Sequence, residues 1–76
     1  MTENYAIDAI DAAGYGLENA VWLKAVMGAI ALDVQHNQGQ SVAELASLGH
    51  YLADDCANYL RSELERLKRE QGDSHA

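Results

Sequence analysis

Apolar residues after Ser41 recur at three- and four-residue steps, which is the spacing of one face of an α-helix. This stripe consists of Val42, Leu45, Gly49, Leu52, Ala53, Cys56, Leu60, Leu64 and Leu67. Ser41 and Glu44 have the spacing of a capping box at the start of a helix, and Gly72 can adopt the left-handed conformation that ends one. The pattern predicts a long helix over residues 42–70, with His50 on its polar face and a frayed tail at 71–76.

Residues 17–37 also have a helical period, but their apolar side chains lie on nearly every side of the helix. One ridge consists of Leu23, Met27, Ile30 and Val34, a second of Val21, Ala25, Gly28 and Leu32, and the remainder of Trp22 and Val26. The chain contains no proline that would interrupt this helix. A helix that is apolar all round must be covered on more than one side, which a single partner helix cannot do.

Between these segments lies the short polar linker 37–40, in which Gly39 can take a positive φ and end the first helix. Short linkers between helices make the two helices antiparallel neighbours. Folding the chain at Gly39 would bring Gly28 opposite Gly49, so we expect a close approach of the two backbones there. The sequence therefore predicts a helical hairpin.

The N-terminal residues 5–15 fit a short amphipathic helix that ends at Gly14, or an irregular segment. This segment could cover Leu64 and Leu67 at the far end of the second helix. A second copy of the hairpin could cover them instead, in a four-helix bundle. We expect one all-α domain over residues 1–76, an antiparallel hairpin that dimerises into such a bundle. This architecture resembles that of the Rop family of plasmid-copy-control proteins; the resemblance rests on architecture alone and implies no RNA-binding residues.

The formal net charge is −7, and the basic residues other than Lys24 and Arg61 cluster at Arg66, Lys68 and Arg69. A surface this acidic does not favour contact with a phosphate backbone, so we expect no direct nucleic-acid binding. Lys24 and Asp33 interrupt the longest apolar stretch, and the first residues are acidic rather than basic. We therefore expect a soluble, cytoplasmic protein that does not bind membranes.

Residues that could carry chemistry are few. Cys56 is the only cysteine and lies in the apolar stripe, so a buried small side chain is expected rather than a nucleophile. His50 and Asp54 are four residues apart, but a metal site normally needs three or four protein ligands. We predict no catalytic residue, cofactor or metal, and hence no enzyme.

Tyr51 projects from the acidic face of the second helix, and an exposed tyrosine among acids can anchor a partner. The candidate partner-binding residues are Tyr51, Asp54, Asp55, Glu44 and Trp22. The hypothesis is a non-enzymatic interaction module, such as a regulator, adaptor or inhibitor, that forms a homodimer and binds another protein. The alternatives are a small chaperone-like subunit of an obligate heterocomplex and an acidic mimic of nucleic acid.

Overall fold

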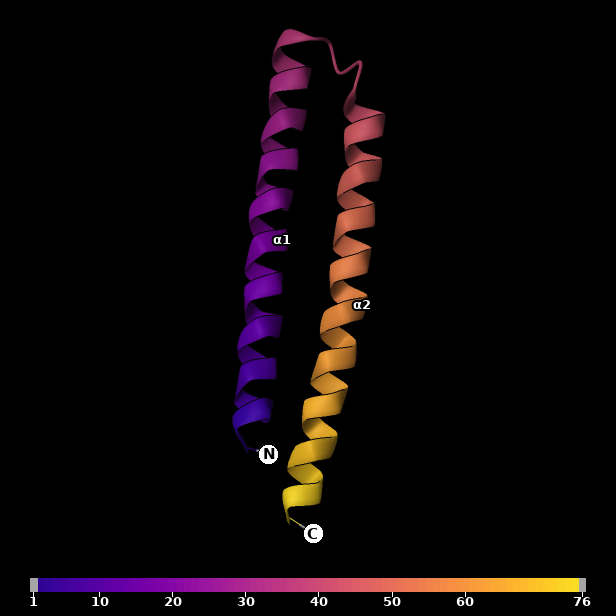
Figure 1. Ribbon diagram of the computed structural model, residues 1–76. Coiled ribbons are helices and arrows are strands. Elements are labelled where there is room, and N and C mark those ends of the chain that lie inside the picture. The colour runs from indigo at the N-terminus through magenta and orange to yellow at the C-terminus, as the bar shows by residue number, and fades with distance from the viewer. Residues whose placement is uncertain (1, 76) are drawn as a thin grey trace.

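The chain folds into two antiparallel α-helices that lie side by side along their whole length. The computed structural model describes the backbone of residues 2–75 and the side chains of residues 8–72. Helix α1 spans Thr2–His36 and helix α2 spans Val42–His75, joined by a turn at one end, so that the chain termini lie together at the other end (Figure 1). The predicted all-α hairpin is confirmed.

The expected separate helix over residues 5–15 is wrong, because α1 continues without a break through Gly14. Packing on α2 explains the continuity. A Cβ placed on Gly16 would lie 3.4 Å from the side chain of Leu60, so this glycine lets α1 approach α2 closely. Nearby, Ala12 is buried and the ring of Tyr15 lies 4.4 Å from that of Tyr59. These contacts outweigh the cost of helical glycine, which is about 1 kcal/mol.

Helix α2 likewise runs past the predicted stop at Gly72 and ends at His75. Glycine penalises a helix by about 1 kcal/mol without blocking it sterically, so Gly72 alone is a weak stop signal. α1 is 35 residues long and α2 is 34, so the expected difference in length does not arise, although the end of α2 extends beyond the start of α1 (Figure 1). Leu67 is half-buried, whereas 53% of Leu64 remains exposed.

Hydrogen bonds to Asp33 hold the turn. In the sequence this residue was noted only as a charge that interrupts the longest apolar stretch. Its carbonyl accepts the N–H groups of Asn37 at 2.8 Å and Gly39 at 3.0 Å. Its carboxylate accepts the side-chain amide of Asn37 at 2.6 Å and the N–H of Ser41 at 2.9 Å. Gly39 has the predicted positive φ of 74°, and Gln38 has φ 60° as well. Helix α2 begins at Val42 as predicted, but Asp33 rather than Glu44 accepts the N–H of Ser41.

The contact between the helices has a seven-residue repeat. Residues buried at the contact are Ala12, Asn19, Val26 and Asp33 on α1, and Cys56 on α2. Seven residues are two turns of a helix that winds around a neighbour, which is the pattern of a coiled coil. Half of these α1 positions are polar, and the buried side chain of Asn19 donates to the carbonyl of Tyr15 at 3.0 Å. We call this buried line of residues the seam.

The expected pairing of Gly28 with Gly49 is wrong. A Cβ on Gly49 would lie 3.4 Å from Val26, whereas a Cβ on Gly28 would meet nothing within 4 Å. Gly28 lies two residues beyond Val26, and at about 100° per residue it points away from the seam. Only Gly49 serves the close approach that was expected of both.

Replacing Gly28 by alanine is expected to stabilise the hairpin by about 0.5–1 kcal/mol, because the added methyl group enters open space and alanine favours the helix. Chemical denaturation followed by circular dichroism measures this gain. The matched change Gly49→Val places a branched side chain against Val26 and should destabilise. A loss of stability in Gly28→Ala would show that this position is packed.

Arg66 joins the helices near the end that carries the termini. Its guanidinium lies 3.1 Å from Asp8 of α1, 2.6 Å from Glu63 and 3.0 Å from Glu70. The hydrogen bond from Arg66 lowers the pKa of Glu63 below its usual value, and the same bond raises the pKa of Arg66. One cation thus bridges three carboxylates from both helices.

Replacing Glu63 by glutamine is expected to lower the thermal midpoint more at pH 7 than at pH 3. A carboxyl group whose pKa is lowered by folding stabilises the fold above its unfolded pKa of about 4.3, and this stabilisation disappears as the pH falls through the folded pKa. Melting wild type and variant at both pH values measures the difference, with the exposed Glu65→Gln as control. An equal difference at both pH values would contradict the role of the charge.

Candidate interaction surface

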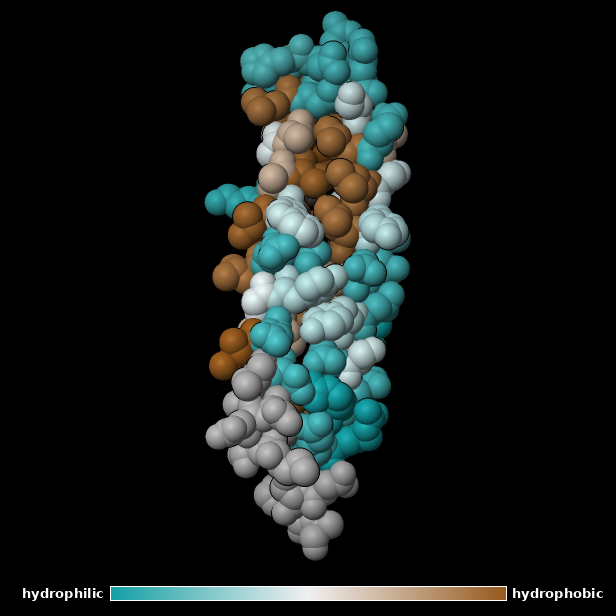
Figure 2. Space-filling model, in the orientation of Figure 1, coloured by the Kyte–Doolittle hydropathy of each residue, from teal (hydrophilic) through white to brown (hydrophobic). Residues whose placement is uncertain are grey.

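Large apolar side chains of α1 remain exposed on the lone hairpin. They are Ile10, Leu17, Val21, Trp22, Met27, Leu32 and Val34, each between 48% and 70% exposed. In Figure 2 hydrophobic side chains gather between the helices near the turn and along the outer edge of α1, while hydrophilic ones cover much of the rest. This confirms the prediction that α2 alone cannot cover α1.

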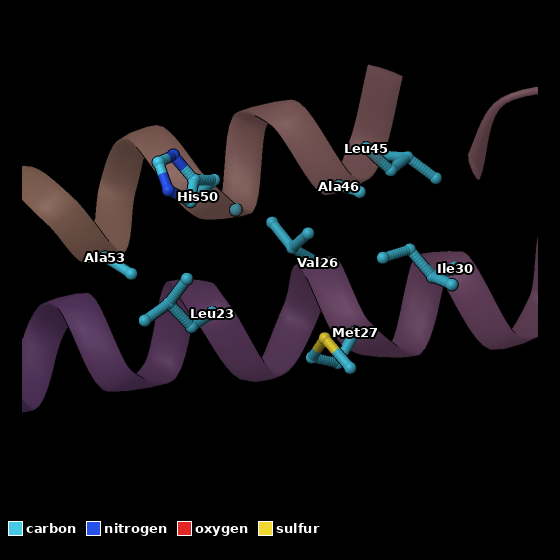
Figure 3. Close-up of a pocket in the computed structure, with 9 residues that line it drawn as sticks. Leu23, Val26, Met27, Ile30, Leu45, Ala46, His50 and Ala53 are labelled. Carbon is cyan, nitrogen blue, oxygen red and sulfur yellow. The ribbon is translucent and has the colours of Figure 1, made fainter. Parts of the chain in front are cut away.

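A shallow groove of about 530 Å³ runs between the helices in the half of the hairpin near the turn. It is lined by Leu23, Val26, Met27, Ile30, Leu45, Ala46, Gly49, His50 and Ala53. In Figure 3 Leu23 and Ile30 of α1 extend toward α2, where Ala53 and Leu45 lie opposite them. His50 was expected on the polar face of α2, but it lines this groove as its single polar side chain.

The seven-residue repeat extends the groove into a longer apolar face. Residues that lie seven or fourteen positions along the same helix from Leu23, Met27, Ile30, Ala46, His50 or Ala53 share their side of that helix. On α1 these added residues are Ala9, Ala13, Gly16, Ala20 and Val34. On α2 they are Ala43, Ala57, Leu60, Leu64 and Leu67. The contact between Gly16 and Leu60 places the two added sets side by side. We call the groove and these residues the groove face; it contains no carboxylate, lysine or arginine.

The opposite side of the hairpin is aromatic and polar. The hydroxyl of Tyr15 donates to Asp55 at 2.9 Å, and the ring of Tyr15 contacts that of Tyr59. The hydrogen bond to Asp55 raises the pKa of Tyr15 above its usual value, so the hydroxyl keeps its proton to higher pH. Trp22 follows Tyr15 by seven residues and lies on this side too, 48% exposed.

The predicted partner-binding residues lie apart from the groove face. Tyr51 is 69% exposed on α2, and Glu44, seven residues earlier, is exposed on the same side of that helix. Asp54 is exposed as well, whereas Asp55 already accepts a hydrogen bond from Tyr15 of α1. The residues of α2 thus share an exposed acidic surface, and Trp22 is contributed by the other helix.

The sequence pattern missed the groove face as a surface. Ala53, Leu60, Leu64 and Leu67 were assigned to the stripe that faces α1, and Ala43, Ala46 and Ala57, which are exposed beside the contact, were not assigned to any surface. The alanines of α2 could have revealed this surface. Ala46 and Ala53 are seven residues apart, and Ala43 and Ala57 are fourteen apart, so they follow the same repeat as the seam.

Groups that could carry catalysis or bind a metal are dispersed. Cys56 is buried in the seam, as expected for a packed side chain. Among the described residues, no three His, Cys, Asp or Glu side chains are arranged to hold a metal ion. Neither helix, over the part of the chain that the structure describes, has a stretch long and apolar enough to cross a membrane.

No family model, curated protein or solved structure matches the chain.

Proposed function

We propose that the protein is a non-enzymatic protein–protein interaction module that works as a homodimeric four-helix bundle. The observation that carries the proposal is the large surface of the lone hairpin, 5825 Å². A compact monomer of 8.3 kDa has an accessible surface of about 4,600 Å². The hairpin exposes about 1,200 Å² more than that.

The shape of the hairpin explains the excess. It measures 58 × 16 × 12 Å, and its radius of gyration is 17.4 Å, against about 11 Å for a compact domain of this length. A two-helix rod has no third layer to cover its apolar sides. Burying about 1,200 Å² on each of two copies reaches the size of the interfaces of permanent dimers, which is about 2,000 Å² or more in total.

In this dimer the acidic surface around Tyr51 stays free for a second protein. Because Glu44 and Asp54 flank the exposed ring of Tyr51, a partner with a basic rim and an apolar pocket for the ring fits this surface best. Retention of a partner by wild type and its loss in Tyr51→Ala would support this role. Equal retention of the partner by wild type and by Tyr51→Ala would exclude a binding role for Tyr51.

The dimer itself is tested by unfolding at different protein concentrations. When folding and association are coupled, the thermal midpoint rises with concentration by mass action. We expect such a rise over about a hundredfold range of concentration. A midpoint that is independent of concentration, with intact helical signal, would contradict the homodimer.

A second candidate function is that of a subunit in an obligate heterocomplex. It is favoured by a separate observation: Ile10, Leu17 and Val21 lie on the side of α1 that faces away from α2, each more than half exposed. A chain of this kind, purified alone, would bind a hydrophobic dye and aggregate. A homodimer that melts cooperatively and binds no dye would exclude this candidate.

A further inference from the structure

We infer that the groove face is the surface through which two copies of this chain bind each other, because its pattern of large and small side chains is complementary to itself. The inference rests on the proposed homodimer and adds which face forms it and why a second copy fits. The alternative faces are the outer side of α1 and the side that carries Tyr15 and Trp22.

The size of the side chains changes between the helices and along them. In the half near the turn, the large residues lie on α1, namely Leu23, Met27, Ile30 and Val34. The facing part of α2 has mostly small residues, Ala43, Ala46, Gly49 and Ala53, with Leu45 and His50 as two larger ones. In the half near the termini the order is reversed. There α1 has the small residues Ala13, Gly16 and Ala20. The large residues are on α2, namely Leu60, Leu64 and Leu67.

Such a diagonal pattern fits itself when a second copy is laid face to face by a two-fold rotation. If the axis runs along the helices, α1 of one copy lies over α2 of the other at the same height. If the axis runs across the helices, each helix lies over its own counterpart with the ends exchanged. In both arrangements most large residues of one copy lie over small residues of the other, with Leu45 and His50 as the exceptions, so the two layers interdigitate.

Charge also favours a second copy on this face over the others. Each chain has a net charge of −7, so two copies approach best through a surface without acids. The groove face has none, and its one ionisable group is His50. By contrast, Glu18 lies near Trp22 on the side that carries Tyr15, and Lys24 interrupts the outer side of α1. The groove face is the long apolar surface that two acidic rods can share.

Paired substitutions test the inference by sedimentation velocity. Met27 and Leu17 both belong to α1 and are 64% and 68% exposed, so a lone hairpin tolerates glutamate equally at either position. Met27→Glu, on the groove face, is expected to weaken the dimer about 100-fold or more, because a charge is buried without a partner. Leu17→Glu, on the outer side, is expected to leave it unchanged.

A second pair repeats the comparison on α2 with residues that are small and exposed. Ala53→Glu is expected to give monomers and Ser47→Glu dimers, and circular dichroism verifies that each variant remains helical. If wild type is dimeric and both groove-face variants remain dimeric, the groove face is not the interface and this inference fails alone. If wild type itself is monomeric, the proposed homodimer fails with it. Dissociation by Leu17→Glu alone would assign the interface to the outer side of α1.

Discussion

Replacing Val26 by aspartate is expected to abolish the cooperative unfolding of the hairpin, whereas the same change at Val21 is tolerated. Val26 lies in the seam with 9% of its surface exposed and packs on Gly49, so a carboxylate there loses water and gains no partner. An uncompensated buried charge costs about 3–5 kcal/mol, a large share of the stability of a chain this short. Val21 is 56% exposed, and an exposed substitution changes stability by about 0.5 kcal/mol or less.

Far-ultraviolet circular dichroism during thermal melting measures this difference. Val26→Asp should give a reduced helical signal that declines without a clear midpoint, and Val21→Asp should melt like wild type. The two variants have the same composition and the same helix, so only the position relative to α2 differs. Equal melting curves would show that Val26 does not hold the helices together.

Replacing Asp33 by alanine is the change expected to have the second largest effect, a loss of about 2–3 kcal/mol. The carboxylate of Asp33 accepts hydrogen bonds from Asn37 and from the N–H of Ser41, and the residue is buried. Without it, the N–H at the start of α2 and the amide of Asn37 lose their partners at the same time. Hydrogen bonds to a charged acceptor contribute more than those between neutral groups.

Equilibrium denaturation of Asp33→Ala, with the exposed Asp54→Ala as control, measures how much the hydrogen bonds of Asp33 in the turn contribute to the free energy of unfolding. Asp33→Asn sharpens the test, because it keeps one acceptor oxygen and should fall between wild type and Asp33→Ala. Amide hydrogen exchange should accelerate at Ser41 in both variants. Slow exchange at Ser41 in Asp33→Ala would mean that Asp33 does not hold the turn.

Features set by neighbouring residues were predictable from the sequence. The start of α2 at Val42 was predicted from the position of Ser41, and the end of the first helix before the turn was predicted from the conformational freedom of Gly39. The apolar residues on all sides of α1 were also visible in the sequence, and they correctly indicated that α2 alone leaves much of the apolar surface of α1 exposed. In each case the signal lies within a few residues of the structure that it specifies.

Features that depend on residues far apart in the sequence, or on the position of the other helix, were not predictable from the sequence. Gly14 and Gly72 each carry a local penalty of about 1 kcal/mol against helix, yet both lie within a continuous helix. Asp33 can accept the N–H of Ser41 only because the turn brings Ser41 back beside it. No spacing of residues in the sequence predicts this hydrogen bond. The groove face was not predicted because Ala53 and the leucines of α2 were assigned to the stripe that faces α1, and Ala43, Ala46 and Ala57 lay outside that stripe.

The mass of the protein in solution, measured by light scattering at neutral pH, tests most directly whether the hairpin is half of an assembly. The chain has a mass of 8.3 kDa, and we predict that the particle has twice that value. A monodisperse particle of 8.3 kDa that retains its helices would contradict the account, because the exposed apolar surface of α1 would then need no second copy.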